Sequence, residues 1–374
     1  MDAANPRAAA AVGDNGGVTD AHPSFRDRVR AEARLVGESL LSFGPSAGRR
    51  WPLALQAGLA MAVPVVLLAV LGHSDIALFA ATGAFTVIYG GWLRPAERAR
   101  FAPLVAASLF ACAALGVLAA AGGVGFVLTG VFVLTIGAVA LTGWISLGPP
   151  GPVFAVLVFG LSAHVTAVED GVRAADPALY LSVVAGALAF ACLLVAAPLV
   201  LPRYRREPVR PLGAIFPPRW GAVARAMTTR AVIVAVVGVA AAAVVDPDRS
   251  YWIVCAGLAV IGSPLGRRAA ATRGIHRMVG TLVGAGVYLA LALIPFPVWA
   301  LGLLLGAFQM LIELIIVRHY ALALVFITPL VLLIIGSASA DATSFTLALE
   351  RVLDTIVGAV VGTAAALAVR LRKD

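Results

Sequence analysis

The chain has 374 residues, 61% of them hydrophobic and 13% charged, with 28 Lys and Arg against 19 Asp and Glu. A soluble domain has about 45–50% apolar and about 25% charged residues, so this composition excludes a soluble enzyme. It also excludes an outer-membrane β-barrel, whose strands alternate apolar and polar residues. We predict an all-α, polytopic integral membrane protein. Its only lysine is Lys373 and its three cysteines lack metal-binding spacing, so we expect no enzymatic activity, no cofactor and no metal.

Residues 1–48 form the first predicted region, a disordered N-terminus followed by an amphipathic cytoplasmic helix. Residues 1–23 are rich in Ala, Gly and Asp and contain no apolar run typical of a signal peptide. From residue 24 to 43, apolar residues recur at helical spacing with four arginines between them. Such a helix can lie on an anionic inner leaflet. A solvated leader that only sets the orientation of the protein is an equally good interpretation.

Twelve apolar runs follow, each a candidate for the roughly 20 residues that a transmembrane helix needs. The first six are Trp51–Leu71, Ile76–Leu93, Phe101–Ala121, Val124–Ile145, Val153–Val168 and Ala178–Leu201. The other six are Ala231–Val245, Tyr251–Leu265, Met278–Leu293, Trp299–Val317, Tyr320–Ile335 and Leu347–Val369. We therefore predict 12 transmembrane helices in two six-helix bundles, residues 49–201 and 231–374. A basic, proline-rich cytoplasmic connector, residues 202–230, joins the two bundles.

The arginines support this topology, because most of them fall between the runs. With the N-terminus inside, the inner segments hold 25 of the 28 basic residues, the outer segments hold Arg173 and Arg249, and Arg351 falls within a span. The positive-inside rule expects such an excess on the cytoplasmic side. We therefore predict a multi-pass protein of the plasma membrane with both termini in the cytoplasm.

The two halves of the chain share one pattern. In each, the first span ends in a short polar turn (residues 72–75 and 246–250), and an Arg-rich loop follows the second span (residues 94–100 and 267–277). Four more spans come after the loop. Because six is an even number, both halves start on the same side of the membrane, so the repeat is parallel rather than inverted. We expect a transport pathway at the interface between the two bundles.

Three motifs stand in order in the second half. They are Arg277-Met-Val-Gly-Thr-Leu-Val-Gly284, Arg318-His-Tyr-Ala-Leu-Ala-Leu-Val-Phe-Ile-Thr-Pro-Leu330 and Glu350-Arg-Val-Leu-Asp-Thr-Ile-Val-Gly358. This stretch, roughly residues 230–370, resembles the membrane domain of the fusaric acid resistance protein-like (FUSC) family. The first half matches only by its pattern of spans. The resemblance implies a bacterial inner-membrane exporter of aromatic carboxylic acids, related to the channel domain of plant aluminium-activated malate transporters. Many members carry a large soluble domain between the halves, whereas here the connector is short.

Arg351 and Asp354 are the first pair of candidate functional residues. A charge at the centre of a membrane helix costs about 2.5–3.5 kcal/mol on insertion scales. The two residues lie three apart, on one face of the last predicted span. Either they form a self-satisfied ion pair that holds this helix in the bundle, or Arg351 attracts a carboxylate while Asp354 orients it or takes up a proton.

A second cluster, Glu313, Arg318 and His319, lies at the end of the tenth span and in the turn after it. A glutamate within the membrane near a histidine is a candidate proton relay. The alternative is interfacial charge that extends toward the lipid headgroups. In the next span, Thr328 precedes Pro329, which removes a backbone hydrogen bond. Broken helices of this kind often line substrate sites.

The leading hypothesis is a secondary transporter that exports small aromatic or organic carboxylates, driven by the proton gradient. Arg351, Arg318, Asp354 and Thr328 would bind or gate the substrate, and Glu313, His319 and Asp354 would couple protons. The alternatives are a passive organic-anion channel and a membrane scaffold that transports nothing. The expected partners are a small organic anion and the lipid bilayer, with no nucleic acid. The sequence leaves a homo-oligomer open.

Overall fold

The computed structural model describes residues 25–45, 48–169, 171–262, 265–336 and 344–371. Contacts among the described residues divide them into two compact units, one that ends at Ser42 and one that begins at Phe43. In the first unit the described element is helix α1 (Phe25–Leu41), which lies where the amphipathic helix was predicted. The predicted disordered segment, residues 1–23, lies outside the described residues.

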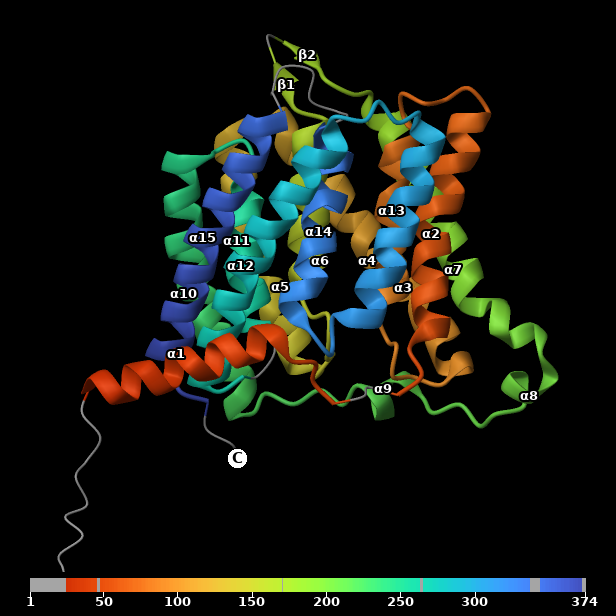
Figure 1. Ribbon diagram of the computed structural model, residues 1–374. Coiled ribbons are helices and arrows are strands. Elements are labelled where there is room, and N and C mark those ends of the chain that lie inside the picture. Colours follow the sequence, from red (N-terminus) through yellow and green to blue (C-terminus); the bar gives the residue numbers. More distant parts are fainter. Residues whose placement is uncertain (1–24, 46–47, 170, 263–264, 337–343, 372–374) are drawn as a thin grey trace, which may run out of the picture. The chain divides into compact units, whose positions relative to one another are not determined.

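The second unit is a bundle of helices that run roughly along one common direction (Figure 1). In the first half these are α2 (Trp51–Val70), η1 (Ala77–Gly83), α3 (Ala84–Ile88), α4 (Pro95–Ala121), α5 (Val124–Trp144), α6 (Val153–Val165), α7 (Pro177–Ala196) and η2 (Ala197–Val200). The short helices α8 (Pro202–Arg205) and α9 (Leu212–Ile215) follow in the connector. The second half contains α10 (Ala222–Val245), α11 (Ser250–Ile261), α12 (Arg267–Ala292), α13 (Val298–Ile315), α14 (Tyr320–Gly336) and α15 (Ser344–Ala368).

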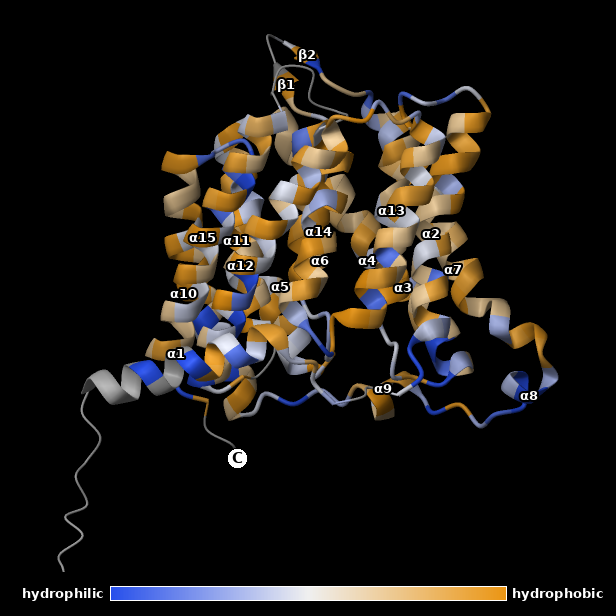
Figure 2. Ribbon diagram, viewed as in Figure 1, coloured by the Kyte–Doolittle hydropathy of each residue, from blue (hydrophilic) through white to orange (hydrophobic). Residues whose placement is uncertain are grey.

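A two-stranded antiparallel hairpin, β1 (Val168–Glu169) and β2 (Val172–Arg173), projects from one end of the bundle. We call this the hairpin end. The connector with α8 and α9 runs across the opposite end, which we call the connector end (Figure 1). Apolar residues extend along the helices between the two ends, and hydrophilic residues gather at the connector end (Figure 2). This distribution is that of a multi-pass membrane protein.

Among the described residues, eight helices are long and apolar enough to cross a membrane: α2, α4, α5, α7 with η2, α10, α12, α13 and α15. The other four predicted spans are shorter apolar helices of 10–17 residues, namely η1 with α3, α6, α11 and α14. A helix of 12 residues, such as α11, is about 18 Å long, whereas the hydrocarbon core is about 30 Å thick. Twelve helices of spanning length were predicted, whereas eight of the described helices reach that length.

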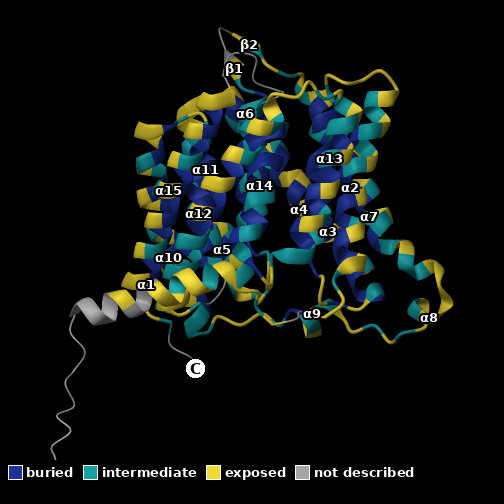
Figure 3. Cartoon of the chain, viewed as in Figure 1, coloured by how far each residue is buried: buried dark blue, intermediate teal, exposed yellow. Residues whose placement is uncertain are grey.

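The short helices are the most deeply buried elements of the second unit. Eleven of the 12 residues of α11 are buried, as are six of the seven residues of η1. In contrast, only 17% of the apolar window of α5 is buried. Figure 3 shows buried residues along the interior faces and exposed residues on the outward faces of the long helices. Short or broken helices are tolerated at membrane depth where protein surrounds them, which explains why the long helices lie outside.

Three helices begin earlier than their apolar runs predicted. Helix α4 begins at Pro95, α12 at Arg267 and α10 at Ala222, so the predicted Arg-rich loops are the first turns of helices. The connector therefore ends at residue 221 rather than 230. The physical reason is visible at Arg230, whose buried guanidinium donates hydrogen bonds to the carbonyls of Leu265, Ala366 and Val369. The free carbonyls of a helix C-terminus carry partial negative charge.

Two helix crossings join the first half of the bundle to the second. Helix α2 packs against α13, and α5 packs against α10. Glycines allow the close approach: a Cβ at Gly58 of α2 would lie 2.8 Å from the carbonyl oxygen of Gly306 of α13, and a Cβ at Gly306 would lie 2.8 Å from that of Gly58. Small residues at such crossings are typical of membrane helices. In each crossing the first helix of one half meets the fourth helix of the other.

Candidate functional site

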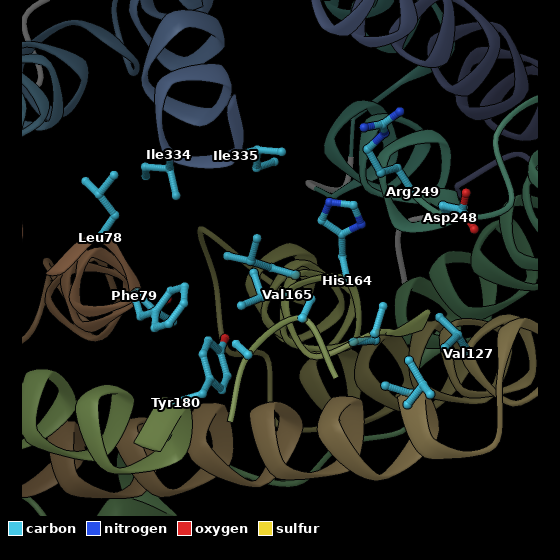
Figure 4. A pocket seen from close by; sticks show the side chains of 18 of the residues that line it. Leu78, Phe79, Val127, His164, Val165, Tyr180, Asp248, Arg249, Ile334 and Ile335 are labelled. Carbon is cyan, nitrogen blue, oxygen red and sulfur yellow. The ribbon is translucent and has the colours of Figure 1, made fainter. Parts of the chain in front are cut away.

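A cavity of about 830 Å³ lies at the hairpin end, where the two halves meet. Residues from both halves line it, among them Leu78, Phe79, Val127, His164, Val165, Tyr180, Asp248, Arg249, Ile334 and Ile335 (Figure 4). Ligand sites are typically concave, about 300–1,000 Å³, and largely apolar with a few polar groups. The cavity has this character, with apolar side chains on one side and His164, Asp248 and Arg249 together on the other (Figure 4).

A second cavity, of about 520 Å³, lies at the connector end of the same interface. Its walls come from the end of α5, the Gly-Pro turn of residues 148–152, the start of α10 and the end of α11. Tyr89 fixes this turn, because its hydroxyl donates a hydrogen bond of 2.8 Å to the carbonyl of Gly151. The interface between the halves is thus hollowed at both ends, and the packed contact of α6 with α11 lies on it.

Arg249, at the start of α11, is the centre of an ion-pair network beside the first cavity. Its Nε donates to Asp246 Oδ2 at 3.2 Å, its backbone N–H donates to Asp246 Oδ1 at 3.0 Å, and its Nη2 donates to Glu350. Burial would lower the pKa of Arg249, but Asp246 and Glu350 outweigh it and hold this pKa above its ordinary value. The network ties the α10–α11 turn to α15.

Arg351, the next residue on α15, is buried within the second half of the bundle. Its guanidinium lies over the ring of Trp252, 4.8 Å from the centroid, and Arg249 approaches the same ring at 5.4 Å. A cation over an aromatic face is stabilised by the ring's quadrupole. The charges of Arg277, from α12, and Asp354 both act on Arg351. Helices α11, α12 and α15 therefore bring their charges and an indole together.

Arg351 and Asp354 do not form the self-satisfied ion pair that was one interpretation of their spacing. Neither Nε nor Nη1 of Arg351 has a hydrogen-bond partner, and neither carboxylate oxygen of Asp354 has one. Both residues are less than 5% exposed. A buried polar group without a partner costs about 1–3 kcal/mol, more if it is charged. Groups held at such a cost inside a membrane protein are typical of functional sites.

Glu313 forms an ion pair with an arginine of the first half. It is buried near the connector end of α13 and accepts a hydrogen bond of 3.1 Å from Nη2 of Arg50, which precedes α2. Arg50 also donates to the backbone carbonyl of Glu313, at 2.9 Å. Nearby, Nη1 of Arg98 donates to Gln56 Oε1 at 2.6 Å. The cation that pairs with this carboxylate is therefore Arg50 of the first half, and not Arg318.

Arg318 and His319 lie in the turn between α13 and α14 and have their own partners. Arg318 is exposed, and its Nε donates to the carbonyl of Gly44 at 3.4 Å. His319 is buried, and its Nδ1 accepts a hydrogen bond from the backbone N–H of Leu322, which caps the start of α14. Its ring lies 6.4 Å from that of His276. The structure therefore gives Glu313 and His319 separate surroundings.

Thr328 is buried in α14, one residue before Pro329, and its hydroxyl is among the buried groups without a partner. It faces α12, because a Cβ added at Gly284 would lie 2.8 Å from Cβ of Thr328. The close crossing of α12 and α14 is therefore the setting of this candidate residue.

Several residues of the charged network were not selected from the sequence. Arg277 and Glu350 belong to the motifs of the second half, and Asp246 and Arg249 belong to its first polar turn, so a signal existed for each. Trp252 had none, since an aromatic residue in an apolar run is ordinary. The sequence placed Arg249 in an outer loop, but its side chain is half-buried beside the cavity.

Comparisons with known proteins agree with the motifs. Residues 231–365 match the family model described as fusaric acid resistance protein-like. One curated relative, "Uncharacterized membrane protein YvaC" of Bacillus subtilis (strain 168), is 37% identical over 118 residues, which is 30% of this chain and 18% of the relative. The match thus covers less than a fifth of that protein. No solved structure matches the chain. Residues 231–365 are therefore similar to a fusaric acid resistance protein-like domain, within a multi-pass membrane protein.

Proposed function

We propose that this protein is a secondary transporter that exports small aromatic or other organic carboxylates across a bacterial plasma membrane, driven by the proton gradient. The pathway follows the interface between the two halves of the bundle. The observation that carries the proposal is the position of the short helices. They are the second and fifth apolar segments of each half, and cavities of about 830 and 520 Å³ lie at the two ends of their interface. Short segments in corresponding positions of two repeats point to a transport site.

The proposal includes twelve crossings in two parallel repeats, with both termini in the cytoplasm. Contacts at the connector end support it. Arg98, near the start of α4, bonds Gln56 near the start of α2, so the chain returns to that end through η1 and α3. Arg230, near the start of α10, bonds Leu265 after α11, so the chain returns in the second half as well. The concentration of arginines at this end favours its assignment to the cytoplasm.

The functional groups fall into two sets along this interface. Arg351 and Asp354, with Arg249, lie toward the hairpin end and supply positive charge and a protonatable carboxylate. Glu313 lies toward the connector end, where its bond to Arg50 links the two halves. We assign Asp354 and Glu313 as the groups that couple protons, because both are buried within spans and both touch helices of a neighbouring segment. Arg318 and His319, at the edge of the bundle, have structural contacts that leave them a secondary role.

A flux assay in proteoliposomes tests the proposal. The purified chain is reconstituted into liposomes, and the liposomes are loaded with radiolabelled benzoate. Efflux is then measured with and without an imposed pH gradient. We expect saturable efflux that slows when the gradient is collapsed. Flux that is unaffected by the gradient would remove the coupling. Single-channel currents carried by benzoate would indicate a passive channel, and the absence of any carboxylate flux would leave a membrane scaffold. A growth screen against aromatic and aliphatic acids identifies which substrates to test.

A further inference from the structure

The buried polar atoms without partners are concentrated in the second half of the bundle. Among the described residues, twelve such side-chain atoms occur, and eleven of them lie on nine residues of α11, α12, α14 and α15. On α11, α12 and α15 they include the Nε and Nη1 of Arg351, the Nε of Arg277, the hydroxyls of Ser250, Tyr251 and Thr355, the indole Nε1 of Trp252, and the carboxylate of Asp354. Every one of these groups except the Asp354 carboxylate can donate a hydrogen bond.

Charge and packing place Trp252, Arg277 and Asp354 around one point, the guanidinium of Arg351. Arg351 lies over Trp252, and the charges of Arg277 and Asp354 act on it. Tyr251 is fully buried against α6 of the first half, where its ring occupies the space that a Cβ at Gly160 would need. The point is therefore enclosed by α11, α12 and α15 and adjoins the proposed pathway. The guanidinium groups of Arg351 and Arg277 and the carboxylate of Asp354 act there together, and Asp246 and Arg249 act in turn on Asp354.

We propose that this point is a binding site for a small monovalent anion, either a halide ion or the carboxylate group of a transported acid. The site rests on the donors, not on transport. Buried donors without partners call for an acceptor, and two arginines in a medium of low dielectric favour an anionic one. Trp252 contacts the Arg351 guanidinium, whose carbon lies 4.8 Å from the ring centroid, and this contact helps to hold the guanidinium in place.

The protonation state of Asp354 changes the affinity of this point for an anion. An ionised Asp354 repels an anion at this point and competes for Arg351, whereas a protonated Asp354 does neither and becomes a donor. Asp246, which follows α10, and Arg249, at the start of α11, act on Asp354. Arg277 acts on Arg351 from α12, and Glu350 of α15 accepts a hydrogen bond from Arg249. A proton on Asp354 and the anion therefore bind cooperatively. This is a statement about equilibrium binding, and it holds whichever way net flux runs.

The test uses the purified full-length protein in detergent. Sodium chloride and sodium benzoate are titrated separately against sodium sulfate of equal ionic strength, and the melting temperature and tryptophan fluorescence are recorded. We expect a saturable response to at least one of the two monovalent anions. Benzoate that displaces chloride identifies the carboxylate of a substrate as a ligand, and a response to chloride alone identifies an inorganic anion. No saturable response to either would overturn the site.

Paired variants locate the site. Arg351→Gln should weaken anion binding about tenfold or more, because a charged hydrogen bond is lost. Asp354→Asn, a neutral isostere of the protonated acid, should strengthen it by about tenfold. Trp252→Phe should abolish the fluorescence response, and Arg100→Gln, at an exposed arginine of α4, should change nothing.

If Arg351→Gln fails to fold, the gain in anion affinity of Asp354→Asn still tests the proposal. Weaker or unchanged binding in Asp354→Asn contradicts the proposal. If carboxylate flux is absent while chloride still binds, the transport function fails and this site stands.

Discussion

The two halves of the bundle differ in how they treat buried polar groups. In the first half nearly every one has a partner: Glu97 binds Arg210 of the connector, Arg98 binds Gln56, and Ser162 contacts Tyr180. Among the described residues of that half, Thr86 alone contributes an unpartnered buried atom, whereas the second half contributes eleven. The two halves share the order of long and short helices, so the fold does not require this difference.

This difference leads us to expect different roles for the two halves. Satisfied polar groups rigidify a bundle, so the first half is suited to be a frame. Unsatisfied ones are retained in a stable membrane protein where function needs them. The fusaric acid resistance protein-like match covers residues 231–365, the half with the unsatisfied groups. We therefore expect substitutions to have structural consequences in both halves, but to change ligand binding in the second.

The largest effect on stability is expected at Arg230 in the second half, and Gln56 provides the comparison in the first half. Arg230→Met leaves the carbonyls of Leu265, Ala366 and Val369 without their donor, which should lower the free energy of unfolding by about 3 kcal/mol. Gln56→Leu loses the bond to the Leu194 carbonyl and the one from Arg98 and should cost about 1–2 kcal/mol. SDS titration of the purified variants measures both. An Arg230 variant as stable as the parent protein would contradict the assignment.

The contact between the halves is tested at Gly306. A Cβ there would lie 2.6 Å from Cβ of Ala62 and 2.8 Å from the Gly58 carbonyl, so Gly306→Val should separate α2 from α13. We expect a loss of about 1–3 kcal/mol in the same titration. Gly286→Ala on α12 is the matched control, because nothing lies within 4 Å of its added Cβ. Equal stability of the two variants would show that the crossing does not hold the halves together.

The ion pair of Arg50 and Glu313 joins the halves at the connector end, and a double-mutant cycle measures it. Arg50→Ala leaves the buried Glu313 carboxylate without its 3.1 Å partner, so it should cost about 2 kcal/mol. Adding Glu313→Gln to it should recover about half of the loss, because the remaining side chain is neutral. The two losses adding without any coupling would mean that the pair does not link the halves.

The smallest effect is expected at Arg318, which the sequence ranked beside Arg351. It is exposed, and its side chain makes a long bond to Gly44. Arg318→Ala should change stability by less than about 0.5 kcal/mol and leave both benzoate flux and anion binding as they were. A tenfold loss of flux in this variant would return Arg318 to the substrate pathway and weaken the contrast with Arg351.

The positions of the helices follow closely from the apolar runs, because a run of Val, Leu, Ile and Ala must be buried in lipid or protein wherever it occurs. Each of the twelve predicted runs contains a helix of the structure. The sequence did not predict the N-terminal turns of α4, α10 and α12, in residues 94–100, 225–230 and 267–277. A hydropathy criterion ends a span at its first charge. The arginines there continue the helix because carbonyls elsewhere in the fold accept their hydrogen bonds, as at Arg230.

The site could be anticipated only in part. Arg351, Asp354 and Glu313 were selected because charges in apolar runs are costly, and all three are buried. The groups that surround them were not predictable, because Arg50 lies 263 positions from Glu313, Trp252 lies 99 from Arg351 and Asp246 lies 108 from Asp354 in the chain. Sequence spacing reports neighbours on one helix only, and these contacts are made between helices.

The amino-acid sequence by itself determined the membrane class, the order of the helices and the family of residues 231–365, because these depend on local composition and on short motifs. Only the tertiary structure decided which helices are short and central, which cation meets which carboxylate, and which buried donors stay without an acceptor. Those properties arise where separate helices cross, and the free energy of a buried charge depends on the groups that other helices bring to it.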